Sequence, residues 1–86
     1  MRYVEMFEEA HREERRLLGE LEVHQAAYYR ALEASPDADP PLSREHSEAL
    51  KKWSAAKDAA DKIYVKAARE NPDHPVIIAY RPFFTQ

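Results

Sequence analysis

The sequence contains no cysteine and only one glycine, Gly19, and none of its six prolines comes before Pro36. Without cysteine, the chain has neither disulfides nor a thiolate metal site, which are the usual supports of a small domain. The missing thiols are typical of cytosolic proteins, and we expect a cytoplasmic localisation. A phosphate-binding loop needs several glycines, so the single glycine excludes one.

Long apolar runs and a strong charge imbalance are also missing. No apolar stretch approaches the roughly 20 residues that cross a bilayer, and the first 16 residues are charged throughout, unlike a signal peptide. The formal net charge is only −3, and basic residues are interleaved with acidic ones. A nucleic-acid-binding surface needs a basic stripe, and none emerges. We therefore predict a chain that binds neither membranes nor nucleic acids.

The first part of the chain carries a seam of mainly apolar residues, spaced alternately by three and four positions. This spacing keeps the seam on one face of a helix, as in a coiled coil, and it predicts a helix over about 2–34. The seam consists of Val4, Phe7, His11, Glu14, Leu18, Leu21, Gln25, Tyr28 and Leu32.

A linker and a second helix follow. Residues 35–42 include three prolines, which disfavour helix, and Ser43 is suited to cap a helix over about 43–70. The short linker predicts one all-α domain over residues 1–86, an antiparallel two-helix hairpin. Folding at the linker pairs position numbers that sum to about 78, which sets Tyr28 opposite Leu50 and Glu14 opposite Tyr64. The second seam consists of His46, Ala49 or Leu50, Trp53, Ala56, Ala60, Ile63 with Tyr64, and Ala67.

The last 16 residues, 71–86, combine three prolines with a short apolar run that begins with β-branched residues. This composition predicts an extended apolar tail rather than a helix. So many large apolar side chains need to be buried, on the tail's own hairpin, on a twin subunit or on another protein. The residues that we expect in such an interface are Val76, Ile77, Ile78, Tyr80, Phe83 and Phe84, together with Trp53 and Tyr28.

Three polar residues sit in the middle of the first seam, His11, Glu14 and Gln25, and the predicted register brings the Tyr64 hydroxyl of the second seam within their reach. We interpret them as a polar layer that fixes the register of the helices, as single buried polar residues do in coiled coils. A metal site is the alternative, with Glu8, His11 and Glu14 as weak candidates, because Glu8 and His11 have the Glu-x-x-His spacing of di-iron bundles. Such a site needs further ligands from a facing helix, so we predict no metal and no cofactor.

The sequence offers no nucleophile with a partner histidine and acid, so we predict no catalytic residues. We expect a non-catalytic protein–protein interaction or assembly module that docks through its seams and its apolar tail. Its partner is itself, as a homo-oligomer, or another protein, as a small subunit or adaptor. Two alternatives stay open: a metal-binding carboxylate/histidine bundle, and a small inhibitor or adaptor of one specific protein.

Overall fold

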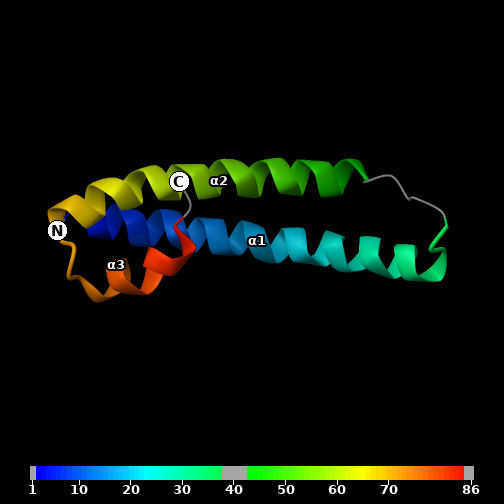
Figure 1. Cartoon of the computed structure of the whole chain (residues 1–86). Helices are drawn as coiled ribbons and strands as arrows, with labels where there is room; N and C mark the ends of the chain where they lie inside the picture. Colours follow the sequence, from blue (N-terminus) through cyan, green and yellow to red (C-terminus); the bar gives the residue numbers. More distant parts are fainter. Residues whose placement is uncertain (1, 38–42, 85–86) are drawn as a thin grey trace.

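Two long antiparallel helices form most of the protein (Figure 1). The computed structural model describes residues 2–37 and 43–84, so the predicted linker at 35–42 lies partly outside the described residues. Helix α1 spans Arg2–Ala34 and helix α2 spans Arg44–Glu70. The predicted all-α helical hairpin is confirmed, and it forms a rod of 50 × 21 × 18 Å.

Local hydrogen bonds define both ends of α2. The Ser43 hydroxyl oxygen accepts a 3.0 Å hydrogen bond from the backbone N–H of His46, which satisfies one of the free donors of the first turn. At the other end, the N–H of Asn71 donates to the carbonyl of Ala67 at 2.9 Å, and Pro72 follows. Ser43 therefore caps the helix as the sequence predicts.

The predicted extended tail is wrong, because residues Pro75–Tyr80 form a third helix, α3, and Arg81–Phe83 continue it as a 3₁₀ turn, η1. Pro75 occupies the first turn of α3, where a missing N–H leaves no hydrogen bond unmade. The ring nitrogen Nδ1 of His74 accepts a 3.2 Å hydrogen bond from the N–H of Val76 and caps the helix. Proline here begins a helix rather than preventing one.

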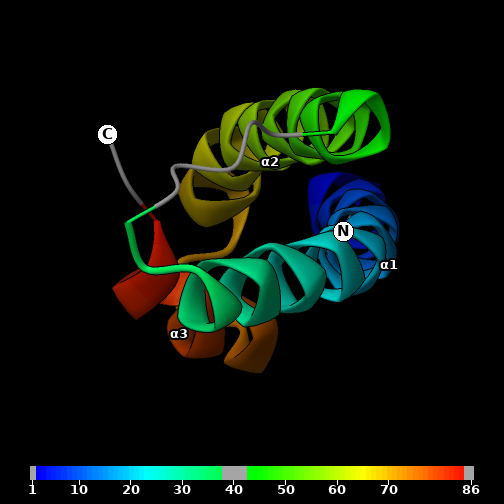
Figure 2. The same cartoon turned by 90° about the vertical axis from the view of Figure 1, so that its right-hand side faces the viewer.

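Helix α3 folds back onto its own hairpin, on one side of the α1–α2 pair (Figure 2). Ile77 and Tyr80 are buried there, and Ile77 has no exposed surface. The apolar tail therefore packs on its own hairpin, rather than on a twin subunit or another protein, which were the other two destinations that the sequence left open. Helix α3 lies near the N-terminal end of α1 and leaves the linker half of the rod as two helices (Figure 1). The core that it completes contains Val4, Phe7, Ala60, Tyr64, Ala67, Ile77 and Tyr80.

The register of the hairpin differs from the predicted one. The ring of Tyr28 contacts that of His46 at 5.9 Å between centroids, rather than lying opposite Leu50. Likewise Tyr64 contacts Phe7, at 5.6 Å, rather than Glu14. The shift amounts to between one and two helical turns, and it places the large ring of Phe7 among small core residues of α2. A large side chain facing small ones fills the space between two helices.

Candidate functional site

A groove of about 560 Å³ lies at the C-terminal end of α3, where that helix stops and the two long helices continue. This volume falls within the roughly 300–1,000 Å³ that is usual for ligand sites. Every helical element contributes to the groove, so its shape depends on the docking of α3. Its lining residues are His11, Glu14, Arg15 and Leu18 from α1, Trp53 and Lys57 from α2, and Val76, Ala79, Tyr80 and Phe83 from α3 and η1.

Two buried polar atoms belong to residues of this groove. Glu14 is only 5% exposed, and within residues 2–37 and 43–84 its carboxylate oxygen Oε2 has no hydrogen-bond partner. The indole nitrogen Nε1 of Trp53 is also buried, again with no acceptor in the described part of the chain. A buried carboxylate without a partner is costly, and a buried N–H without an acceptor is costly to a lesser degree. Two of the residues that line the groove, Glu14 and Trp53, therefore each carry one buried polar atom without a partner.

Aromatic rings form one wall of the groove. The imidazole of His11 stacks on the ring of Phe7, with centroids 5.5 Å apart and planes inclined by only 7°. Its other neighbour is Tyr80, whose ring meets it edge to face at 4.9 Å. Tyr80 also contacts Phe7, at 4.7 Å. These ring contacts fix His11 and Tyr80 in the wall, and they bind α3 to α1.

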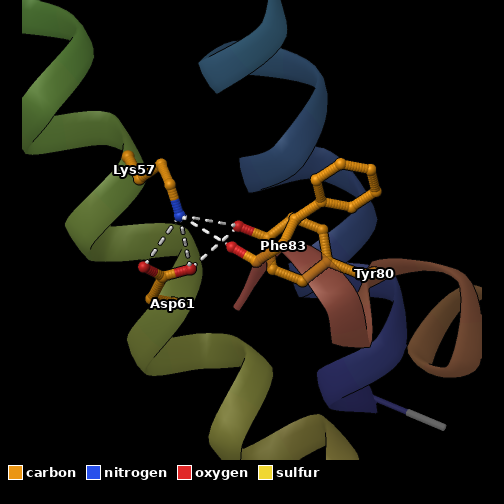
Figure 3. Close-up of polar contacts among 4 residues, drawn as sticks. All are labelled: Lys57, Asp61, Tyr80 and Phe83. Atoms are coloured by element: carbon orange, nitrogen blue, oxygen red, sulfur yellow. Dashed lines mark hydrogen bonds and ion pairs between the residues drawn. The ribbon is translucent and has the colours of Figure 1, made fainter. Parts of the chain in front are cut away.

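A polar cluster ties α3 to α2 beside the groove (Figure 3). The Tyr80 hydroxyl donates a 2.8 Å hydrogen bond to Oδ1 of Asp61. The ammonium group of Lys57 donates to both carboxylate oxygens of Asp61, at 3.1 and 3.2 Å, and to the Tyr80 hydroxyl at 3.3 Å. It also reaches the backbone carbonyl of Phe83, at 3.4 Å. Lys57 and Asp61 thus neutralise each other. They also hold the C-terminal segment, by which we mean α3 and η1, at Tyr80 and Phe83.

The cluster changes the proton affinity of its members. Burial alone would lower the pKa of Lys57, but hydrogen bonds to Asp61 and Tyr80 outweigh it and raise this pKa above its ordinary value. Burial raises the pKa of Tyr80, and the hydrogen bond that its hydroxyl donates to Asp61 raises it further. Both groups therefore keep their protons more firmly in the folded protein than in the unfolded chain.

The structure separates the predicted interface residues of the tail by exposure. Burial in the core of the same chain leaves Ile77 and Tyr80 inaccessible to a partner of the folded protein, so an intermolecular role stays a prediction only for the accessible side chains. Trp53 and Tyr28 are both half-buried, Trp53 in the groove and Tyr28 against His46. Of the other tail residues, Val76 and Phe84 are half-buried, whereas Ile78 and Phe83 are exposed.

The predicted polar layer does not form one group. His11 and Glu14 both line the groove, whereas Tyr64 packs in the core against Phe7 and Gln25 lies half-buried farther along α1. The register shift separates them, because it moves Tyr64 toward Phe7 and away from Glu14. Their predicted common function in fixing the register is therefore not supported.

The weak metal candidates Glu8, His11 and Glu14 do not make up a metal site. In the two described stretches of the chain, no three histidine or acidic side chains gather closely enough to hold an ion. Glu8 and Glu14 lie six positions apart on α1, and neither belongs to a group of three such side chains in the part of the chain that the structure describes.

Sequence reasoning missed the cluster of Lys57, Asp61 and Tyr80. The spacing of Lys57 and Asp61, four residues apart on a helix, does indicate an ion pair between them. Their contact with Tyr80 could not be foreseen, because it depends on α3 being helical and folded back.

None of the helices in the described residues is long and apolar enough to cross a membrane.

Comparison with known proteins leaves the site to be interpreted from its own geometry. No protein-family model matches the chain, and neither a curated protein nor a solved structure is significantly similar to it.

Proposed function

We propose that the protein is a non-catalytic interaction module that assembles with a second copy of itself through the outer surface of its C-terminal segment. The observation that carries this proposal is the division of that segment into two sides. Ile77 and Tyr80 are buried against the hairpin, whereas their neighbours Ile78 and Phe83 are 51% and 66% exposed. Large apolar side chains held outward on an anchored segment are typical of interaction sites.

The anchoring of the segment favours binding. The polar cluster around Lys57 holds the carbonyl of Phe83, and the guanidinium of Arg81 donates a 3.2 Å hydrogen bond to the carbonyl of Pro72. A segment that is ordered before binding loses little conformational entropy when a partner docks. Ile78 and Phe83 can thus contribute most of the free energy of their burial to association.

The linker half of the rod supports self-association. Its two helices lack the third element that α3 supplies at the other end, and they expose Val23, Tyr29 and Leu50. A small domain with little core gains stability when a second copy covers such side chains. Two hairpins side by side would complete a four-helix arrangement. We place this assembly in the cytoplasm, because the chain contains no cysteine.

The mass of the protein in solution tests the proposal. Light scattering on a sizing column should give about twice the chain mass of 10.0 kDa for the wild type, and a value near 10.0 kDa for the Ile78→Ser/Phe83→Ser double variant. Lys51→Ser, an exposed change elsewhere, should leave the dimer intact. Point variants are preferable to a truncation, because deleting α3 would also remove Ile77 and Tyr80 from the core.

A monomeric wild type would contradict self-association. The alternative of a small inhibitor or adaptor of one specific protein would then take its place. The double variant separates assembly from core packing, because it removes the exposed side chains of Ile78 and Phe83 and keeps the buried ones of Ile77 and Tyr80.

A further inference from the structure

We propose that the groove at the end of α3 binds a small organic cation, an ammonium group on an apolar or aromatic body, with the carboxylate of Glu14 as its counter-ion. This site goes beyond the proposed assembly function and does not rest on it, and the two surfaces share Phe83. The groove joins four features that such a ligand needs: sufficient volume, apolar walls, aromatic rings and one buried unpaired charge.

Glu14 carries the argument. Its side chain lines the groove, the residue is 95% buried, and Oε2 lacks a hydrogen-bond partner throughout residues 2–37 and 43–84. A carboxylate in such a place is destabilising unless a cation or hydrogen-bond donor reaches it. An ammonium group is both, and its N–H···O bonds to a carboxylate are stronger than bonds between neutral groups.

The other charged groups beside the groove do not satisfy Glu14. The Lys57 ammonium is already bonded to Asp61, Tyr80 and the carbonyl of Phe83. Arg15 is exposed on the rim, where water solvates its guanidinium. His11 is held between aromatic rings. With Lys57 and Asp61 neutralising each other, the one unpaired charge on a buried residue of the described lining is the negative charge of Glu14.

The walls suit the rest of the ligand. Leu18 and Val76 provide aliphatic surface, and the rings of Trp53 and Phe83 provide aromatic surface. Aromatic faces attract organic cations within about 6 Å of the ring centre.

The experiment uses the full-length protein and two probes of nearly identical shape, 2-phenylethylammonium and the neutral 2-phenylethanol. Trp53 is the only tryptophan of the chain and lines the groove, so its fluorescence reports occupancy directly. We expect the ammonium probe to change the Trp53 emission in a saturable way and to raise the melting temperature. The alcohol should bind more weakly by a factor of at least about ten, since it has no charge to pair with Glu14.

Two variants separate binding from folding. Glu14→Gln should weaken the ammonium probe about tenfold and leave the melting temperature of the free protein equal to or above that of the wild type, because it removes a buried unpaired charge. Glu22→Gln makes the same change at an exposed position of α1 and should leave both quantities unchanged. Equal affinity for the two probes, equal affinity of Glu14→Gln and wild type, or no response to either probe would overturn the proposal. The oligomer mass is measured separately, so failure here leaves the assembly proposal standing.

Discussion

The Tyr80 hydroxyl donates a 2.8 Å hydrogen bond to Asp61, a residue 19 positions earlier on a different helix. This bond joins the C-terminal segment to α2. Beside it lies the ion pair of Lys57 with Asp61, the only one among the described residues in which both side chains are largely shielded from solvent. The ring of Tyr80 also contacts the rings of Phe7 and His11 of α1. One side chain of α3 therefore connects all three helices.

Removing the Tyr80 hydroxyl should destabilise the protein. Tyr80→Phe keeps the ring contacts and deletes a hydrogen bond to a charged, partly buried acceptor, for which we expect a loss of about 1–2 kcal/mol. In a domain of this size that loss lowers the melting temperature by roughly 4–15 °C. Tyr29→Phe makes the same change at an exposed ring and should have little effect. Equal melting temperatures for the two variants, measured by circular dichroism, would contradict the importance of this bond.

Stability should also fall at alkaline pH. The pKa values of Tyr80 and Lys57 are both raised in the folded protein, so the folded state binds protons more tightly than the unfolded chain. Their contribution is fully present below about pH 10, near the ordinary values, and is lost as the pH rises through the raised values. Urea unfolding of wild type and Tyr80→Phe measures this directly. The stability difference between them should shrink above about pH 10, and a constant difference would refute the linkage.

Replacing the only glycine should stabilise α1. Gly19 lies inside the helix, and in the described residues no neighbouring atom comes within 4 Å of the place that a Cβ would take. Alanine is favoured over glycine in helices by up to about 1 kcal/mol. Gly19→Ala should therefore raise the free energy of unfolding by nearly this amount. Ala27→Gly, at another exposed position of α1, should lower it by a similar amount. A destabilised Gly19→Ala protein would show that this part of α1 contacts another surface.

The sequence predicted the elements of the fold better than their arrangement. Helix spacing, the prolines and the Ser43 cap are local signals, and both long helices begin and end close to the predicted residues. The register was wrong because a seam that repeats every seven residues pairs almost equally well after a shift of one or two turns. What fixes it is the fit of Phe7 against small residues and against α3, which the spacing does not contain.

The candidate site was predictable only in part. Glu14 stands out in the sequence as a carboxylate on an apolar seam, and the structure does bury it. The groove around it exists because α3 is helical and folds back, whereas the sequence predicts an extended tail there. Proline is favourable in the first turn of a helix, where Pro75 stands, and His74 before it caps α3 although histidine is not a usual capping residue.

The docking of α3 on its own hairpin is tested by two adjacent isoleucines. Ile77 is fully buried in the core and Ile78 is half exposed, so the same substitution should have very different effects. Ile77→Ala should cost about 2–5 kcal/mol, from lost burial and from the cavity left beside Phe7. Ile78→Ala should change the stability of the monomer by no more than about 0.5 kcal/mol.

Urea unfolding of the two variants, at a protein concentration low enough to keep the chain monomeric, measures both costs. Hydrogen exchange adds a local readout, because a loosened α3 should lose protection in Ile77→Ala while the middle of α1 keeps it. Equal, small effects of both substitutions would mean that the C-terminal segment does not stay on the hairpin in solution. In that case the groove would lose the wall that Val76 and Tyr80 provide, and the cation site would lose its basis.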